Sequence, residues 1–300
     1  MKVALKIDVD THQGLAEGVP QLARTLTDLG VTGTFFIAMG PDNSGRAIMR
    51  MFRNPGFLTK MRRTNAVAMY GMRTVLSGTL LPARPIALAY PQVIRDLAAA
   101  GFEVGLHGYD HVYWQDHIGE LDEAAVRAEI EEAAEVYRAI LGDQPKCFAA
   151  PGWRTSAIAA RVLETMRLGY HSDTRGRDPY RCRVDGQVLT TPEIPTTLPT
   201  LDEVMGTTAV AAAGSVVEYY LRQMREDVLN VHTIHAETEG MGQLEVLVAL
   251  LKALQSHGAE FVRLNEIASG LAPAELPICE VVRASLPGRA GWVSAQGPAT

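Results

Sequence analysis

The stretch MKVALKIDVD, residues 1–10, decides the fold that we predict for this chain. Its apolar and β-branched residues are typical of a buried strand. The strand ends in Asp8 and Asp10, whose side chains point to the same side because side chains alternate along a strand. Two carboxylates on one face of a buried strand cost free energy unless a cation or a proton-transfer role compensates. The alternative is an acidic strand end that turns into solvent.

Strand and helix patterns alternate through most of the chain. This alternation favours a parallel sheet with helical crossovers, and about seven such units fit a closed or nearly closed barrel better than an open sheet. In such barrels the chemistry collects at the C-terminal ends of the strands. Further strands are predicted at residues 31–39, 102–106, 146–150, 169–173, 188–195, 228–235 and 261–264, with helices at 14–29, 91–100, 121–141, 158–166, 216–225 and 244–257.

The composition narrows the class of protein. A chain of 300 residues with 47% hydrophobic content suits one large domain or two small ones. No apolar run approaches the roughly 18 residues of a membrane span, and no signal peptide is recognisable, so we expect a cytoplasmic protein. Cys147, Cys182 and Cys279 are widely spaced and indicate reduced thiols. No G-x-G-x-x-G or Walker pattern occurs, which argues against nucleotide-cofactor chemistry.

Residues 43–95 differ in charge from the rest of the chain. They contain no Asp or Glu and carry a charge of +9, against −15 for the remainder. A basic block on an acidic body implies an anionic partner. Because Met, Phe and Leu residues are interleaved with the arginines, we predict that residues 44–85 form an amphipathic insert that docks on an anionic membrane surface. The alternative is a solvated insert whose apolar residues pack on the barrel.

Two histidines, His107 and His111, follow the strand predicted at residues 102–106. They converge on one point if the segment between them makes a single helical turn. With one carboxylate from the first strand they would form a two-histidine, one-carboxylate set that leaves metal positions open. The alternative is a loop in which both histidines are ordinary hydrogen-bonded polar groups.

His235 ends the strand predicted at residues 228–235. A histidine at the end of a barrel strand is placed to act as a proton donor or a base. His232 lies three residues earlier and should face the opposite side of the strand, away from this site. The alternative is that His235 is a core or surface histidine without a chemical role.

The order of these motifs resembles that of the polysaccharide deacetylase family, also called the NodB-homology family. The shared motifs are Asp8-x-Asp10, His107-x-x-x-His111, Pro151-Gly152-Trp153-Arg154, Ser172-Asp173 and Ile234-His235. Longer stretches resemble a branch of that family that deformylates a lipid-linked sugar. They are IDVDT at 7–11, GPDN at 40–43, GWR at 152–154, IPTTLPT at 194–200, TIHAE at 233–237 and GRAGW at 288–292.

The resemblance implies a role for each motif residue. Asp8 is the implied catalytic base and His235 the general acid. The implied metal ligands are Asp10, His107 and His111.

Two further motif positions have implied supporting roles. Arg154 and Asp173 are implied to tune and orient the acid and the base. Arg154 follows the proline of its motif, whereas the wider family has arginine before it, so the partner of Arg154 stays open. We also consider Arg154 and Arg175 as ligands of the phosphate on the lipid carrier.

The resemblance implies an α/β fold, a distorted (β/α)7 barrel over residues 1–270 with the basic amphipathic insert at 44–85 after the second strand. Pro, Gly and Ala dominate from Leu271 onwards, so we assign residues 271–300 to a C-terminal tail whose order the sequence does not give.

The implied function is that of a metal-dependent hydrolase. It would remove the N-formyl group from undecaprenyl-phosphate-linked 4-deoxy-4-formamido-L-arabinose and release formate, in the lipid A modification that gives polymyxin resistance. One divalent ion would be the cofactor, and zinc suits the N/O ligand set, although nickel, cobalt or manganese can occupy it. The implied location is peripheral, on the inner face of the cytoplasmic membrane, with no nucleic-acid partner.

Two alternatives stay open. The first is a deacetylase of the same family that acts on another N-acylated sugar or glycan. The second is a membrane-surface binding protein with an inactive barrel.

Overall fold

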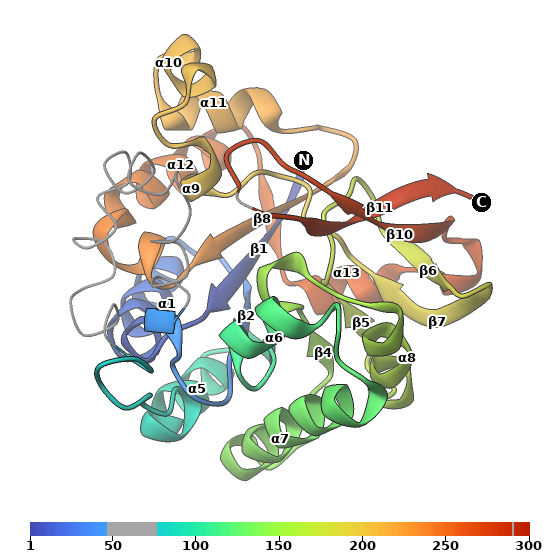
Figure 1. Ribbon diagram of the computed structural model, residues 1–300. Coiled ribbons are helices and arrows are strands. Elements are labelled where there is room, and N and C mark those ends of the chain that lie inside the picture. Colours follow the sequence, from blue (N-terminus) through green and yellow to red (C-terminus); the bar gives the residue numbers. More distant parts are fainter. Residues whose placement is uncertain (47–76, 290) are drawn as a thin grey trace.

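The computed structural model describes residues 1–46, 77–289 and 291–300, and one mixed sheet runs through these ranges (Figure 1). The strand order along it is β11-β10-β6-β7-β5-β4-β3-β2-β1-β8, and β9 pairs with β1 off this path. The strands are β1 (Lys2–Val9), β2 (Thr34–Ile37), β3 (Glu103–Leu106), β4 (Cys147–Phe148), β5 (Tyr170–His171), β6 (Tyr180–Val184), β7 (Gln187–Glu193), β8 (Leu229–His235), β9 (Glu260–Val262), β10 (Ile278–Ala284) and β11 (Val293–Ala299).

Parallel pairing brings the C-terminal ends of several strands to one edge. β1 lies between β2 and β8, with Asp8 in register with Phe36 on one side and His235 on the other. Ile37 of β2 is in turn level with Leu106 of β3. The antiparallel pairs are β6 with β7 and β10 with β11. The sheet is therefore largely parallel, as predicted, and the predicted site residues follow strands that end at the same level.

Helices connect the strands and cover the sheet (Figure 1). The α-helices are α1 (Val19–Asp28), α5 (Pro91–Ala99), α6 (His111–His117), α7 (Glu123–Leu141), α8 (Ala157–Thr165), α9 (Leu201–Val204), α10 (Thr208–Ala213), α11 (Val216–Gln223), α12 (Leu244–Ser256) and α13 (Leu264–Gly270). Shorter turns of helix are η1 (Gly14–Gly18), η2 (Ala87–Ala89), η3 (Pro151–Trp153), η4 (Thr238–Gly242) and η5 (Pro273–Glu275).

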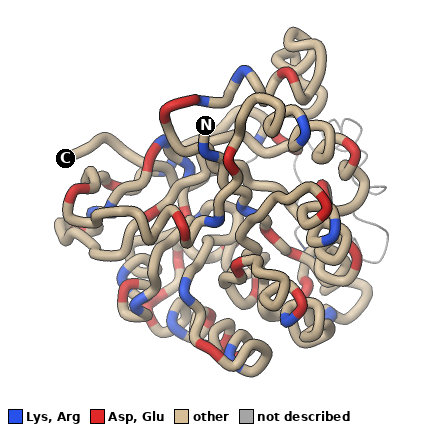
Figure 2. The backbone as a smooth tube through the Cα atoms, turned by 180° about the vertical axis from the view of Figure 1, so that it is seen from behind, with Lys and Arg blue, Asp and Glu red and all other residues tan. Residues whose placement is uncertain are grey.

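The local sequence determines where helix α7 begins and ends. Asp122 caps its first turn, and Gly142 ends it in the left-handed region with φ of +74°. Ile130 is buried on the face toward the core, while Arg127 and Glu123 form an ion pair on the exposed face. Figure 2 shows acidic and basic residues distributed over the described chain as a whole.

The predicted closed barrel is not confirmed. The path of paired strands ends at β8 and β11, and within the described ranges no strand ladder joins β8 to the far side of the sheet. Instead, the backbone N–H groups of Thr197 and Leu198, which follow β7, donate to Val231 O of β8 at 3.1 and 3.2 Å. The sheet therefore bends until its two sides meet through irregular chain, not through a regular strand pair.

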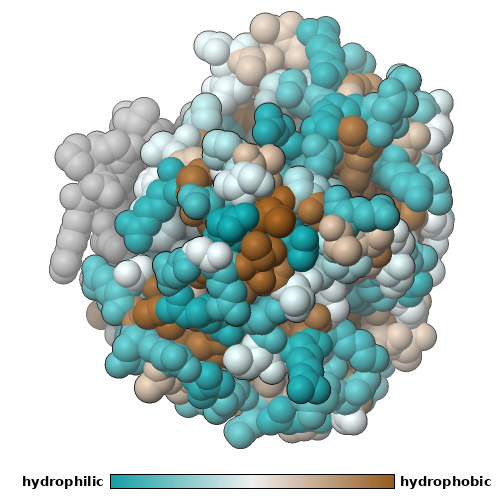
Figure 3. All heavy atoms as spheres, turned by 90° about the vertical axis from the view of Figure 1, so that its right-hand side faces the viewer, coloured by the Kyte–Doolittle hydropathy of each residue, from teal (hydrophilic) through white to brown (hydrophobic). Residues whose placement is uncertain are grey.

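The C-terminal tail after Leu271, whose order the sequence did not give, forms two strands. β10 pairs in parallel with β6, and β11 pairs antiparallel with β10, so the C-terminal segment extends the sheet. Valines at Val281 and Val293 supply strand-forming residues, and the prolines and glycines around them hid this pattern. On the face drawn in Figure 3, several small apolar areas lie among hydrophilic residues.

The predicted insert at residues 44–85 falls largely outside the described ranges, so its amphipathic character is not tested. At its described end, Leu80 and Leu81 are exposed, and Leu88 in η2 is exposed as well. Within the described ranges, no helix combines the length and the apolar character that crossing a bilayer requires.

Candidate active site

Asp8 and Asp10 lie at the C-terminal end of β1. Asp8 is buried, with 3% of its surface exposed, whereas the Asp10 side chain is 22% exposed. His235 of β8 is the direct neighbour of Asp8 across the sheet. Asp8 therefore does not turn into solvent, and the alternative of a solvated strand end is wrong for this residue.

Two histidines meet the carboxylate of Asp10. His107 Nε2 lies 3.3 Å from Asp10 Oδ1, and His111 Nε2 lies 3.4 Å from Asp10 Oδ2. Ligand atoms of the three residues all lie within 4.8 Å of one another. His107 Nδ1 donates to Ala149 O at 2.8 Å, which directs its Nε2 toward Asp10. Two imidazoles and one carboxylate are typical of catalytic metal sites with open positions.

The histidines converge by a route other than the predicted helical turn. His107 directly follows β3, Gly108 turns the chain with φ of +75°, and α6 begins only at His111. Asp110 caps α6 by accepting hydrogen bonds from two backbone N–H groups of its first turn. A glycine turn and a helix cap therefore direct both rings toward Asp10, and the segment between them does not make a single helical turn.

The charges around this cluster favour a bound cation. Burial opposes ionisation of Asp10, but the neighbouring imidazoles of His111 and His107 outweigh burial and hold the pKa of Asp10 well below its ordinary value. Burial lowers the pKa of His111, which favours the neutral ring that a metal ion needs. In the described part of the chain, the buried oxygen Asp10 Oδ1 has no hydrogen-bond partner. A buried carboxylate oxygen without a partner, next to two imidazoles, fits a divalent ion.

His235 lies at the end of β8, beside this cluster. Its ring is 6.3 Å from the ring of Trp153, centroid to centroid, in an edge-on arrangement. Burial lowers the pKa of His235, but the negative charges of Asp10, Asp202 and Asp8 outweigh burial and raise it to about 9. The imidazole therefore carries a proton at neutral pH, as a proton donor must.

His232 belongs to a different environment. Its ring lies 4.6 Å from the ring of Tyr220 in α11, centroid to centroid. Burial, with the charge of Arg175, lowers the pKa of His232 to about 3, so this ring is neutral. It is not among the residues that surround Asp10.

Sequence reasoning missed two buried glutamates that brace the site. Glu237 Oε1 accepts hydrogen bonds from the backbone N–H groups of Asp10 and Thr11 at 2.9 and 2.8 Å. Glu239 Oε2 accepts from the backbone N–H of His235 at 2.9 Å. The bonds of Glu237 fix the chain after β1 against the chain after β8, and the bond of Glu239 fixes the end of β8 against the turn that follows it. The available signal was the pair of acids that follows His235 within four residues.

The indole ring of Trp153 lies next to the imidazole of His235. Gly152 and Trp153 both have positive φ, +61° and +53°, which is a strained conformation for tryptophan. Trp153 Nε1 donates to Thr196 Oγ1 at 2.9 Å. The cations near this ring, with their distances to its centroid, are Lys6 Nζ at 5.2 Å, Arg175 Cζ at 4.9 Å and Arg289 Cζ at 4.5 Å. The motif at residues 151–154 therefore places an indole among positive charges beside the proton donor.

Arg154 and Arg175 have partners within the protein. Arg154 donates to the carbonyl oxygens of Trp292 and Gln115 at 3.1 and 2.7 Å, which ties the turn at residues 151–154 to the C-terminal segment. Arg175 is buried and donates to Glu203 at 2.9 Å and to Leu198 O at 2.9 Å. Phosphate binding by either arginine stays a prediction, and it would have to compete with these contacts.

Asp173 lies in a second buried cluster, with His171 and Glu193. Asp173 Oδ2 is 3.3 Å from His171 Nδ1, and Glu193 Oε1 accepts from the backbone N–H groups of Asp173 and Thr174. Although burial lowers the pKa of His171, Asp173 outweighs burial and raises it, which favours an imidazolium paired with Asp173. The predicted role of Asp173 in orienting the acid and the base stays untested.

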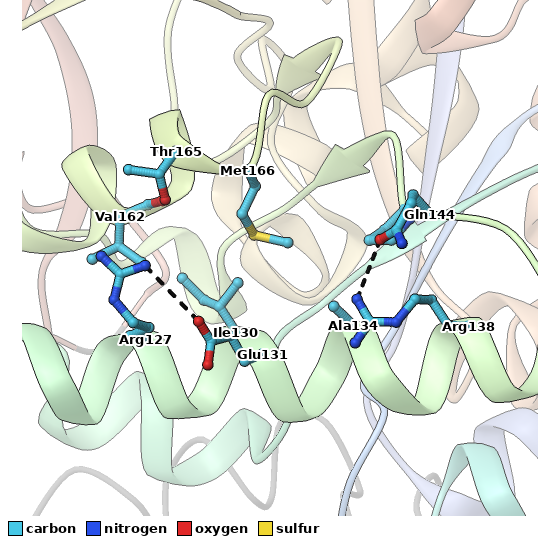
Figure 4. Close-up of a pocket in the computed structure, with 10 residues that line it drawn as sticks. Arg127, Ile130, Glu131, Ala134, Arg138, Gln144, Val162, Thr165 and Met166 are labelled. Carbon is cyan, nitrogen blue, oxygen red and sulfur yellow. Dashed lines mark hydrogen bonds and ion pairs between the residues drawn. The ribbon is translucent and has the colours of Figure 1, made fainter.

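A groove of about 380 Å³ lies between α7 and α8 (Figure 4). Its walls carry two polar contacts, Arg127 with Glu131 at 3.9 Å and Arg138 with Gln144 at 3.2 Å. None of the residues that line it belongs to the cluster around Asp10. The groove therefore has no connection to the chemistry described above.

Comparison with known proteins decides the family. The model of the polysaccharide deacetylase family matches residues 2–171, which is more than half of the chain. This chain belongs to the polysaccharide deacetylase family. The resemblance read from the motifs is thereby confirmed.

Relatives in this family match the chain nearly end to end. Two carry the name 4-deoxy-4-formamido-L-arabinose-phosphoundecaprenol deformylase ArnD. The protein from Shewanella sediminis is 34% identical over 98% of this chain and 94% of its own length. The protein from Wigglesworthia glossinidia brevipalpis is 32% identical over 94% of this chain and 98% of its own length.

Solved structures share the fold. A polysaccharide deacetylase structure from Mycobacterium smegmatis has a TM-score of 0.63 and 20% identity, covering 95% of this chain and 94% of its own. Together with the family match, these findings make the chain a hydrolase of the deacetylase and deformylase type, which acts on carbon–nitrogen bonds.

Proposed function

We propose that this protein removes the N-formyl group from undecaprenyl-phosphate-linked 4-deoxy-4-formamido-L-arabinose, with a divalent metal ion as cofactor. The observation that carries the proposal is the cluster of Asp10, His107 and His111 beside Asp8 and His235. It occurs in a chain that aligns over 98% of its length with a protein named for this deformylation. The reaction belongs to the lipid A modification that gives resistance to polymyxin.

Asp10, His107 and His111 would hold the ion in this proposal. Zinc suits the two imidazoles and one carboxylate, and nickel, cobalt or manganese can occupy the same set. A divalent ion held there polarises the amide carbonyl, acidifies water and stabilises the charge that develops on oxygen.

The remaining steps belong to side chains of this chain. Asp8 accepts the proton that water loses when its oxygen attacks the formyl carbon. His235, protonated at neutral pH, donates to the nitrogen as the carbon–nitrogen bond breaks, because an unprotonated amine is a poor leaving group. Formate and a free amino sugar result. Glu237 and Glu239 accept hydrogen bonds from the backbone N–H groups of Asp10 and His235, and so fix the positions of these two residues.

In this proposal the chemistry takes place at strand ends. We propose a distorted seven-stranded barrel over residues 1–270 whose closure runs through the contacts of Thr197 and Leu198 with Val231. Residues 44–85 are the proposed docking insert, and residues 271–300 add the strand pair β10 and β11 to the sheet.

Release of formate tests the function. Purified protein loaded with zinc or cobalt is incubated with the undecaprenyl-phosphate-linked formamido sugar in detergent micelles, and formate is measured. The N-acetyl analogue of the same lipid-linked sugar is the comparison. The proposal expects formate from the first substrate and little acetate from the second. Acetate release without formate release would instead support the deacetylase alternative.

The location of the substrate implies a protein that docks on the inner face of the cytoplasmic membrane. Leu80 and Leu81, which are 80% and 44% exposed, and Leu88, which is 56% exposed, support an apolar contact at the described end of the insert. Arginines near an anionic bilayer add roughly 1 kcal/mol each.

Vesicle flotation tests the docking. We expect the double variant Leu80→Glu/Leu81→Glu to bind vesicles containing anionic lipid roughly tenfold less than wild type, because two leucines that would enter the bilayer interface are replaced by charges. Val282→Glu on β10, where Val282 is 38% exposed, is the matched control and should bind like wild type. Equal binding of all three proteins would contradict docking through this segment.

A further inference from the structure

Lys6 is fully buried on β1. Its exposed fraction is 0%, and it is among the largest fully buried side chains of the described residues. Lysine is almost never fully buried without a partner. Since Lys6 precedes Asp8 by two residues on the same strand, both side chains point to the same side. The ammonium group of Lys6 therefore lies on the same face of β1 as the carboxylate of Asp8, which is the base in the proposed function.

The contacts of Lys6 fix its position. Nζ donates to Ser172 O at 2.9 Å and lies 3.7 Å from Asp8 Oδ2. The rings of Phe36 and Trp153 close the pocket, with centroids 5.6 and 5.2 Å from Nζ. The ammonium therefore has one neutral acceptor, one carboxylate and two aromatic faces around it, with no contact to solvent.

Few cationic side chains lie near the carboxylate of Asp8. Within the described ranges, the cationic side chains within ion-pair distance of Asp8 are Lys6 at 3.7 Å and His107 at 3.8 Å, both measured to Oδ2. In the proposed function His107 is a neutral ligand, so Lys6 is the side-chain cation that remains for Asp8. The other oxygen, Oδ1, is buried without a hydrogen-bond partner in the described structure.

We propose that Lys6 is the positioning residue for Asp8. Its ammonium anchors Oδ2 and so leaves Oδ1 as the oxygen that accepts the proton of the attacking water. The inference rests on the proposed function, and it gives the segment after β5 a role: the carbonyl of Ser172 holds Lys6, and Lys6 holds Asp8. Arg154, which the family resemblance placed in a supporting role, donates to Trp292 O and Gln115 O.

The test is a double-mutant cycle on the full-length, metal-loaded protein. Lys6→Met, Lys6→Arg, Asp8→Asn and the double variant K6M/D8N are assayed for hydrolysis of the best amide substrate of the wild type. Metal content and Tm are measured for each protein. Lys146→Met is the matched control, because Lys146 is exposed and pairs with Asp143 on the surface.

We expect K6M to lower kcat about 100-fold, the size of effect that loss of a positioned proton acceptor produces, with KM and metal content near the wild-type values. K6R should restore kcat to within about tenfold of wild type, because guanidinium keeps the charge. In the D8N background, K6M should cause no further loss, since Lys6 acts through Asp8.

Three results would overturn the inference. They are wild-type kcat in K6M, an equal factor of loss in the wild-type and D8N backgrounds, and failure of K6R to restore activity when its Tm and metal content are normal. If K6M does not fold, the kcat of K6R relative to that of wild type still tests the role of Lys6. A wild type that hydrolyses no amide refutes the proposed function as well, whereas an active wild type with unaltered K6M refutes only the role of Lys6.

Discussion

Replacing His107 with alanine is expected to remove the bound divalent ion and to lower kcat/KM by roughly 10³- to 10⁴-fold, the equivalent of several kcal/mol of lost transition-state stabilisation. The reason is geometric. His107 Nε2 and His111 Nε2 face the two oxygens of one carboxylate at 3.3 and 3.4 Å, so removal of one ring leaves an incomplete ligand set. Metal content by elemental analysis and formate release are the two measurements.

His257→Ala is the matched control for this variant. His257 is exposed at the end of α12, and its Nδ1 donates to Ala253 O within that helix. The control should keep its metal and its activity. Retention of a stoichiometric ion by H107A with unchanged kcat would show that the ligand set is wrong. Addition of a strong chelator to the wild type should reproduce the defect of H107A, and re-addition of metal should reverse it.

Replacing His235 with glutamine is expected to lower kcat about 10²- to 10⁴-fold for the amide, because the proton for the departing amine is lost. An O-acyl ester of similar size should lose less, since an alcohol leaves more readily than an amine. The metal content should stay at the wild-type level, because His235 is not among the residues around Asp10 that could hold the ion. Equal losses for the amide and the ester would contradict the role of His235 as proton donor.

The pH profile gives a second test of His235. Its pKa is raised to about 9 by Asp10, Asp202 and Asp8 against the effect of burial, so the catalytic proton is present at neutral pH and is lost as pH rises through the folded-state pKa. A bound cation offsets the charge of Asp10 and moves this limb to lower pH. The alkaline limb of kcat should be absent in H235Q and present in His117→Gln, a control at an exposed position of α6.

The sequence predicted the strand ends well because their signals are local. β1, β3 and β8 are apolar runs that stop at charged or imidazole side chains, and parallel pairing alone brings such ends to one edge. The grouping of Asp8, Asp10 and His235 at one edge therefore follows from the sequence pattern. The approach of His107 to His111 does not, because a glycine turn and the Asp110 cap, not helical periodicity, produce it.

Other features depend on tertiary contacts that a pattern does not contain. In the sequence, nothing distinguishes Lys6 from other polar residues of a strand, although the alternation of side chains along β1 places it beside Asp8. Strand β10 is held by pairing with β6, and β11 by pairing with β10, whereas their own proline- and glycine-rich sequence predicted a tail. The contact between the chain after β7 and β8 depends on the irregular segment at Thr197, for which the sequence offers no periodic signal.

Anomalous scattering from crystals of the metal-loaded wild type tests the central claim most directly. The account predicts one strong peak bounded by Asp10, His107 and His111, within reach of the carboxylate of Asp8. A peak at the second buried cluster of His171, Asp173 and Glu193, with none at the first, would contradict it.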